Sequence, residues 1–214
     1  MGYRLPNGSI MEIAATYGTQ FAVTGITNAN PGVVTAPDAA LADGDVVALT
    51  SGWTRLNDRA FRADAPTADG FTLEGVDTSG AAFTAGAGTG TGRAVATWNQ
   101  ISQITDVATA GGEQQFATFG FLEEDEDRQL PTTKSAMSMT LTVADDPTLP
   151  YVATCEAADD DREPRVLRLT LPNGSVILYN AYVSISATPS LSRNNIMTRT
   201  ITLSLAGRPV RYAA

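Results

Sequence analysis

The clearest periodic pattern in the chain lies between residues 137 and 143, where apolar and hydroxyl side chains alternate. The apolar positions are Met137, Met139, Leu141 and Val143, and the hydroxyl positions are Ser138, Thr140 and Thr142. A period of two is typical of a strand with one buried face and one solvated face. Further strands are predicted over residues 10–15, 101–109, 115–122, 166–171, 176–187 and 196–206.

Turn and cap signals fix how some of these strands connect. Pro172-Asn173-Gly174 joins two predicted strands as a hairpin, since proline presets φ while asparagine and glycine accept positive φ. The same Leu-Pro-Asn-Gly-Ser motif begins at Leu5 and leads into the strand at residue 10. Asp146 followed by Pro147 resembles an N-cap and a first-turn proline, which predicts a helix over about 147–160. The expected fold is mostly β, a β-sandwich or rolled β-barrel flanked by one α-helix.

The composition changes between residues 19 and 94, where short apolar runs are separated by Asp-Gly and Ser-Gly turns. This pattern predicts a small β module inserted into a main domain that is formed by residues 1–18 and 95–214. The glycine-rich stretch over 85–92 is interpreted as a flexible return linker. A phosphate-binding role for these glycines is disfavoured, because a strand rather than a helix follows them.

Charge is distributed unevenly along the chain. The net formal charge is −9 at pH 7, with 14 basic and 23 acidic side chains. Acidic residues dominate 106–161, whereas basic residues dominate 162–214. Such an asymmetry favours pairing between unlike surfaces of identical subunits, although two solvated faces that never meet would give the same composition. The candidate partners across subunits are Asp159, Asp160, Asp161, Arg193, Arg199, Arg208 and Arg211.

The side-chain inventory excludes several kinds of chemistry. The chain has no histidine and one cysteine, Cys155, so imidazole catalysis and zinc sites built on His or Cys clusters are ruled out. Cys155 lies among apolar residues of the predicted helix and is interpreted as a small core residue. We therefore expect no catalytic residue, no metal ligand and no cofactor. No run is apolar enough for a signal peptide or a membrane span, and no membrane partner is expected.

The acidic run over 123–127 is the strongest local charge feature. Its five acids could hold an acid/base pair of the glycosidase kind, but exposed neighbouring carboxylates offer little to separate two pKa values. Calcium binding lacks a known ligand spacing. A solvated loop that becomes ordered on assembly is the favoured interpretation. The loop residues are Glu123, Glu124, Asp125, Glu126, Asp127, Arg128 and Gln129, with Lys134 after them.

The segment GGEQQFATFGFLEEDEDRQLPTTKSAMSMTLTVADDP, over 111–147, resembles the tail tube proteins of long-tailed bacteriophages, as do LRLTLPNGSVILYNAYVSIS and LSLAGRPVRYA near the C-terminus. The resemblance covers about residues 95–214 well and 1–18 loosely, and the segment over 19–94 is similar to a small β module found in phage structural proteins. It implies hexameric rings that stack head to tail into a hollow tube in the virion tail, through which DNA leaves.

This resemblance gives the candidate residues their expected roles. The chain is expected to be synthesised and assembled in the bacterial host cytoplasm, with itself and other tail proteins at the tube ends as partners. The acidic loop and Lys134 should lie between rings. DNA should pass without specific binding along a channel lined by hydroxyls, unless those faces point outward. The candidates for the channel face are Ser138, Thr140, Thr142, Ser184 and Ser186. A virion adhesion or decoration module that binds a host-surface glycan is the alternative, and a carboxylate hydrolase is more distant.

Overall fold

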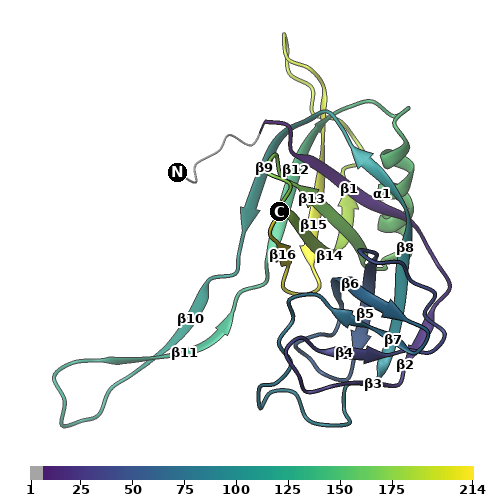
Figure 1. The fold of residues 1–214 in the computed structure, drawn as a ribbon. Coiled ribbons are helices and arrows are strands. Elements are labelled where there is room, and N and C mark those ends of the chain that lie inside the picture. The colour runs from purple at the N-terminus through teal and green to yellow at the C-terminus, as the bar shows by residue number, and fades with distance from the viewer. Residues whose placement is uncertain (1–6) are drawn as a thin grey trace.

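Residues 7–214 are described by a computed structural model, in which the chain is almost entirely antiparallel β structure with one helix in the described part (Figure 1). The main half of the molecule contains most of the strands outside residues 19–89. These strands are β1 (Ile10–Tyr17), β8 (Gly90–Ile101), β9 (Ile104–Ala110), β12 (Ser138–Ala144), β13 (Arg165–Thr170), β14 (Val176–Ile185), β15 (Thr198–Leu205) and β16 (Val210–Tyr212). The helix is α1 (Pro150–Asp161). The other strands are β2 (Phe21–Val23), β3 (Gly25–Ile26), β4 (Val33–Thr35), β5 (Val46–Ser51), β6 (Arg59–Thr67), β7 (Gly70–Leu73), β10 (Gln114–Phe119) and β11 (Arg128–Lys134).

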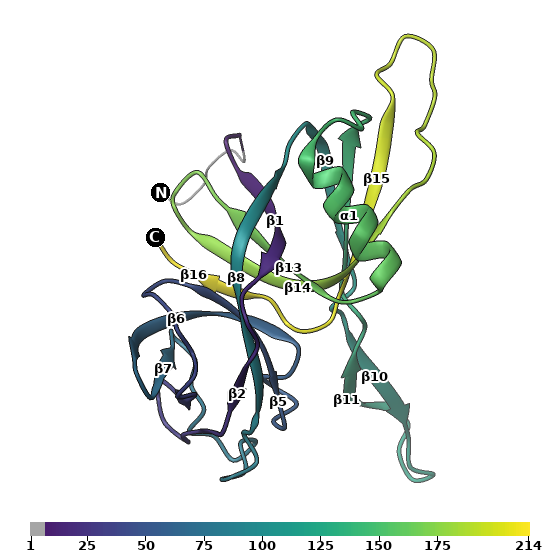
Figure 2. The ribbon, with the colours of Figure 1, turned by 90° about the vertical axis from the view of Figure 1, so that its right-hand side faces the viewer.

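One continuous sheet runs through both halves of the molecule. Its 14 strands follow the order β3-β4-β7-β6-β5-β8-β1-β13-β14-β15-β12-β9, with β16 paired to β14 and β2 to β8. Strands β10 and β11 form a separate two-stranded sheet. Helix α1 lies against the main half, where it packs on β14, β8 and β1 (Figure 2). The predicted mostly-β fold flanked by one helix is confirmed.

The main core lies between α1 and the sheet. In β12, Met139, Leu141 and Val143 are buried, as the alternation predicts. Met137, the fourth apolar position of the pattern, lies before the strand and is 37% exposed, so its predicted burial is wrong. From the helix, Tyr151 and Cys155 pack into the same cluster. Truncating a buried leucine such as Leu141 to alanine costs about 2–5 kcal/mol, because it removes apolar contact and leaves a cavity. This cluster holds the helix on one face of the sheet and leaves the other face of β12 without a helix.

Helix α1 begins at Pro150 rather than at Pro147, so its predicted start is wrong. Asp146 does not cap the helix, because its carboxylate accepts hydrogen bonds from the backbone N–H and the hydroxyl of Thr148. These contacts form a turn before the helix and hold the pKa of Asp146 below its usual value. Pro150 then takes the first-turn position that Pro147 was expected to occupy.

The hairpin around residues 171–176 is confirmed. Strands β13 and β14 pair from Thr170 with Val176, and the Leu171 N–H donates to the Ser175 carbonyl at 2.9 Å. Gly174 has a φ of 84°, which is a conformation that glycine adopts without strain. In the first copy of the motif, Leu5 and Pro6 lie outside the described residues.

The segment over residues 19–94 builds a second hydrophobic cluster around Phe61, Phe71 and Trp53. Its return to the main domain is not a flexible linker over its whole length, because β8 begins at Gly90. A Cβ at Gly90 would lie 2.1 Å from the Thr50 carbonyl oxygen, and one at Gly92 would lie 2.5 Å from the Phe21 ring. The glycines at the start of β8 therefore allow neighbouring backbone and side chains to pack closely against the strand. This packing, rather than a flexible linker, explains glycine at these positions.

The half formed by residues 19–94 is joined to the main half by direct contacts as well as by β8. The backbone N–H of Arg62 donates to the Tyr212 hydroxyl at 2.9 Å, and the Arg62 guanidinium lies 4.5 Å from the centroid of that ring. Buried Val46 and Ala60 from this half pack in the same cluster as Leu178 and Tyr212. Whether residues 19–94 fold alone as an inserted module stays a prediction.

A long β-arm projects away from both halves (Figures 1 and 2). Strands β9 and β12 pair as a hairpin, and β10 and β11 continue it. The predicted strand over 115–122 ends at Phe119, and β11 was not expected from the sequence. Gly111 and Gly112 interrupt the hairpin with φ values of 81° and 80°. A Cβ on Gly111 would lie 1.8 Å from the Ala136 carbonyl oxygen, so glycine is required at this break.

Candidate assembly surfaces

The hydroxyl face is the open face of the sheet formed by β12, β15 and the end of β14. Residues directly opposite each other in an antiparallel pair point to the same side of the sheet. The register therefore brings onto one face Ser138 with Ser204, Thr140 with Thr202, Thr142 with Thr200, and Thr202 with Ser184. Ser184, Thr200 and Ser204 are exposed and the others are half-buried. Four of the five channel candidates thus share one surface.

The remaining candidate, Ser186, lies just beyond β14. Its hydroxyl accepts a hydrogen bond from the Thr200 N–H at 3.0 Å, so it supports the end of the pairing with β15. The sequence reasoning missed Asp106, which is opposite Thr142 in the register of β9 and β12 and is exposed. It carries the only charge at the register positions of this face, and its sign is negative. Period-two counting across three strands could have found it.

The acidic tip, residues 120–127, joins β10 to β11 at the far end of the arm. Glu124 forms an ion pair with Arg128, whereas the structure gives the other four acids of the run no ion pair among residues 7–214. Every residue of β11 is exposed, Lys134 included. The side chains of Phe121 and Leu122 are 51% and 107% exposed beside these acids. The Phe121 ring is contacted by Phe119 at 5.6 Å and by Arg128 at 5.8 Å, measured to the ring centroids, and it stays half exposed. The tip therefore combines negative charge with exposed apolar surface.

Lys134 lies at the opposite end of the arm from the acidic tip. It pairs with Gln114 where the arm leaves the sheet, while Arg128 pairs with Phe119 next to the tip. The predicted group of loop residues is therefore split between the two ends of β11.

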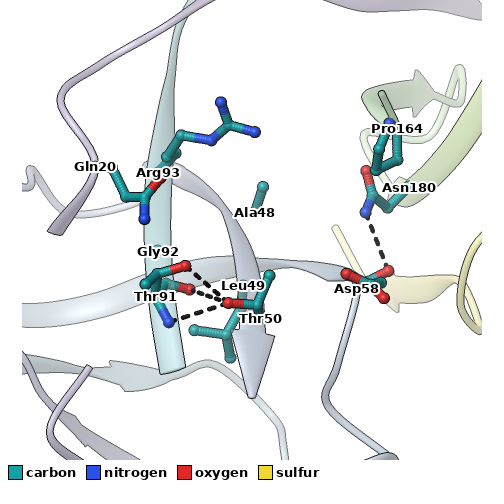
Figure 3. Close-up of a pocket in the computed structure, with 10 residues that line it drawn as sticks. All are labelled: Gln20, Ala48, Leu49, Thr50, Asp58, Thr91, Gly92, Arg93, Pro164 and Asn180. Carbon is teal, nitrogen blue, oxygen red and sulfur yellow. Dashed lines mark hydrogen bonds between the residues drawn. The ribbon is translucent and has the colours of Figure 1, made fainter. Parts of the chain in front are cut away.

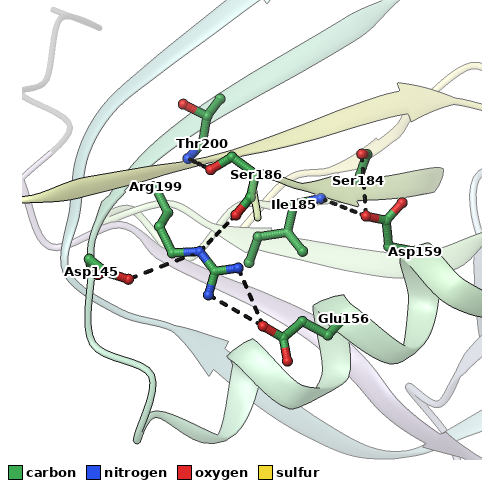
Figure 4. A network of polar contacts seen from close by, with 8 residues as sticks. All are labelled: Asp145, Glu156, Asp159, Ser184, Ile185, Ser186, Arg199 and Thr200. Atoms are coloured by element: carbon green, nitrogen blue, oxygen red, sulfur yellow. Dashed lines mark hydrogen bonds and ion pairs between the residues drawn. The ribbon is translucent and has the colours of Figure 1, made fainter. Parts of the chain in front are cut away.

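Arg199 is the centre of a polar network inside the subunit (Figure 4). Its side chain is 10% exposed and pairs with Asp145 at 4.0 Å and with Glu156 at 3.3 Å. Its Nε also donates to the Ser186 carbonyl at 2.9 Å. Arg199 was predicted to pair with another subunit. Within the subunit its charge already pairs with Asp145 and Glu156, because its position in β15 turns it toward α1.

The three aspartates at the end of α1 have different surroundings. Asp159 accepts hydrogen bonds from the Ile185 N–H at 3.3 Å and from the Ser184 hydroxyl at 3.5 Å, at the edge of β14 (Figure 4). Asp161 pairs with Arg165 and accepts a hydrogen bond from the Glu163 N–H. Asp160 is exposed. Two of the three are thus held within the chain, and Asp160 stays available for a partner subunit.

The remaining predicted charge partners are exposed. Arg193 lies in the loop between β14 and β15, Arg208 lies between β15 and β16, and Arg211 lies in β16. The structure gives none of these three an ion pair with residues 7–214. They stay candidates for contacts between subunits.

A small cavity of about 130 Å³ lies where the two halves meet (Figure 3). The Thr50 hydroxyl lies 2.8 Å from that of Thr91 on one side, and the Asn180 side chain donates to the Asp58 carbonyl at 3.1 Å on the other. Its charged lining residues are Asp58 and Arg93. The contacts join strands of both halves, and the lining holds no nucleophile paired with a base. We assign it a structural role at the junction.

Other chemistry in the described part of the chain is sparse. Cys155 is fully buried, and burial raises the pKa of its thiol to about 12. This confirms the core role predicted for Cys155 and makes it a poor nucleophile at neutral pH. Across residues 7–214 no three His, Cys, Asp or Glu side chains gather in a way that could hold a metal ion. The helix found there is too short and too polar to cross a membrane.

The described chain combines an antiparallel sheet, a projecting arm and an open hydroxyl face. Residues 51–214 match the family described as phage tail tube protein, and the chain belongs to this family. No curated protein matches the chain. The family is structural, and the resemblance stated from the sequence is confirmed.

Solved structures of similar shape come from tails and related devices. A chain from the virion of a native gene transfer agent particle is 13% identical with a TM-score of 0.43, covering 54% of this chain and 89% of its own. A chain from the tail of an empty gene transfer agent particle, described with C6 symmetry, is 12% identical with a TM-score of 0.44, covering 55% and 88%. A chain from the sheath–tube complex of an extracellular contractile injection system is 18% identical with a TM-score of 0.37, covering 50% of this chain and 80% of its own. The family assignment rests on the sequence match.

Proposed function

We propose that this chain is the repeating subunit of a tail tube, in which hexameric rings stack head to tail around a hollow channel. Membership of the phage tail tube protein family over residues 51–214 is the observation that carries this proposal. The DNA of the particle leaves through the channel without specific binding. Other tail proteins meet the tube at its two ends, and the subunit is made and assembled in the cytoplasm of the bacterial host.

The exposed strand β9 supports assembly through the sheet. It is the last strand of the 14-stranded path, so one of its edges has no strand beside it among residues 7–214. Six of its seven residues are exposed, and Val107 is 47% exposed although it lies opposite buried Leu141. A long edge strand with uncovered apolar surface favours pairing with another chain, and a closed ring satisfies such edges.

The hydroxyl face supports the channel. Tail DNA carries a dense array of negative charge and binds strongly to lysine and arginine. The face formed by β12, β15 and the end of β14 has hydroxyls and Asp106 at its register positions, without a cation. Such a lining repels phosphate and holds an ordered layer of water. We therefore assign the channel lining to Ser138, Thr140, Thr142 and Ser184, with Asp106 near the edge.

Assembly of the purified chain tests the function. We expect size-exclusion chromatography to give large species and negative-stain microscopy to show rings or tubes. A stable monomer that binds saccharides would instead support a glycan-binding adhesion module, and turnover of a substrate would support an enzyme. A variant with charge added at the exposed edge, Val107→Lys, should assemble less while keeping its monomer fold, since it places a cation where the edge strands would meet.

A further inference from the structure

Cations without acidic partners gather at one place on the surface. Among residues 7–214, seven basic side chains have no ion pair: Arg55, Arg59, Lys134, Arg162, Arg193, Arg208 and Arg211. Four of them line two adjoining cavities of about 500 and 540 Å³, which share Gly207 and Arg208. We call this joint concavity the basic cleft. It lies between the base of the arm, the loop from β15 to β16, and the loops around residues 54–59 and 76–83.

One arginine of the cleft, Arg59, is held in place by backbone carbonyls. Arg59 Nε donates to the Arg208 carbonyl at 2.9 Å, and a terminal Arg59 nitrogen donates to the Arg55 carbonyl at 2.7 Å. Burial and the neighbouring charge of Arg208 lower the pKa of Arg59. Carbonyls orient a guanidinium without neutralising it. Arg59 therefore gives the cleft one oriented positive group.

Acidic residues offset only part of the charge of the cleft, since one acid lines it beside four basic side chains. Asp77 is the acidic residue of its lining, and its carboxylate accepts hydrogen bonds from the Ser79 N–H at 2.8 Å and the Ser79 hydroxyl at 2.6 Å. Apolar side chains also line the cavities. Leu56, Val76 and Phe83 belong to one, and Met137 and Leu205 to the other. The ligand that fits has several negative charges next to apolar groups.

The acidic tip of the arm has this chemistry. Five acids follow directly on Phe121 and Leu122, whose side chains are exposed. The tip cannot reach the cleft of its own chain, because Lys134 and Arg128 mark opposite ends of β11. Six residues of strand separate them by about 20 Å. Folding the tip back would break the pairing of β10 with β11, so it must enter the cleft of another copy.

We propose that the basic cleft binds the acidic arm tip of a second copy of this chain. The proposal deepens the proposed function, since it names the contact by which one subunit holds the next. In this contact Lys134, Arg208, Arg55 and Arg59 face the acids of the run over 123–127, and Phe121 and Leu122 cover the apolar lining.

A peptide tests the contact without requiring tubes. The probe is a fluorescent peptide of residues 119–130, titrated with the full-length chain and followed by anisotropy. We expect saturable binding that weakens with salt. In a control peptide, all five acids are changed to their amides. This peptide should bind at least about tenfold more weakly than the acidic peptide. Arg55→Glu with Arg208→Glu should weaken binding by a similar factor, whereas the matched exposed control Arg193→Glu should not. Equal binding of both peptides, or equal loss in the control variant, overturns the proposal.

Charge reversal tests the contact in assembly. Asp125→Lys with Glu126→Lys should reduce tube formation, as should Arg55→Glu with Arg208→Glu, and the chain carrying all four changes should recover it. Circular dichroism and the monomer's melting curve confirm that each variant folds. If the chain forms tubes but does not bind the peptide, and neither charge reversal reduces tube formation, the cleft contact is overturned and the tube function stands. Peptide binding by a chain that never forms tubes would support the contact and count against the tube function.

Discussion

Thr140 of β12 lies directly opposite Thr202 of β15 on the open face of the sheet. Thr202 is in turn opposite Ser184 of β14, so three hydroxyl side chains form a row across three strands. The neighbouring row contains Thr142 and Thr200, with Asp106 beyond them on β9. A side chain changed within this row alters the surface that we assign to the channel without disturbing the core under α1.

Thr140→Arg should therefore leave assembly intact and make the channel retain DNA. The change places one guanidinium per subunit on the lining, where phosphate contacts bind strongly and depend on salt. We expect slower DNA ejection and salt-sensitive DNA binding to tubes. Thr140→Ser, which keeps the hydroxyl, is the control. Unchanged ejection in a normal Thr140→Arg tube would show that this face points away from the DNA.

The acidic run over 123–127 should change its hydrogen exchange on assembly. Like charges repel each other, and among these residues only Glu124 has an ion pair, with Arg128. We expect fast amide exchange in the monomer and slow exchange in the tube, measured by mass spectrometry on matched samples. The exposed residues 84–87 provide an internal reference within the same peptide map. Equal protection in both states would remove the loop from the assembly contacts.

Arg199→Ala should destabilise the monomer. The change removes a side chain that is 10% exposed, so Asp145 and Glu156 lose their ion-pair partner. Because the Glu156 side chain is 52% exposed, the loss in the free energy of unfolding should be about 1–3 kcal/mol, below that of a fully buried pair. Exposed Arg193→Ala is the matched control and should change stability by less than about 0.5 kcal/mol. Urea denaturation of the two variants gives both values, and equal stability would contradict the structural role of the network.

Cys155 should be inert in the folded chain and reactive in the unfolded one. Burial raises the pKa of its thiol from an ordinary value of 9.0 to about 12. Because the folded pKa is the higher one, the stabilisation is present below about pH 9 and is lost as the pH rises toward 12. The unfolding free energy of the wild type should therefore fall relative to that of Cys155→Ala over this range. Rapid labelling of the native chain by a thiol reagent at pH 8 would contradict this burial.

The sequence predicted those elements that depend on local pattern. The alternation around Leu141 and the turn at Gly174 are confirmed, because strand period and turn chemistry act over a few residues. The start of α1 was wrong because Pro147 and Pro150 offer the same signal, and only the contact between Asp146 and Thr148 decides between them. The strand β11 was missed because its residues are exposed and carry no buried alternation.

The candidate surfaces were predicted in part for a related reason. Ser138, Thr140 and Thr142 could be grouped because they share one strand, whereas Asp106 joined them only through the pairing of β9 with β12. The basic cleft could not be foreseen, since Arg59 and Arg208 are far apart in the chain and meet through a hydrogen bond from the Arg59 side chain to the Arg208 carbonyl. Similarly, the sequence could not show that Arg199 faces α1 and is paired within the subunit.

Cryo-electron microscopy of the assembled chain tests the central claim most directly. We expect tubes of stacked rings with six subunits each, in which the face bearing Thr140, Thr202 and Ser184 lines a channel without cations. The acidic tip should lie in a neighbouring copy. An assembly whose channel is lined by arginine, or one in which the hydroxyl face lies on the outside, would contradict the account.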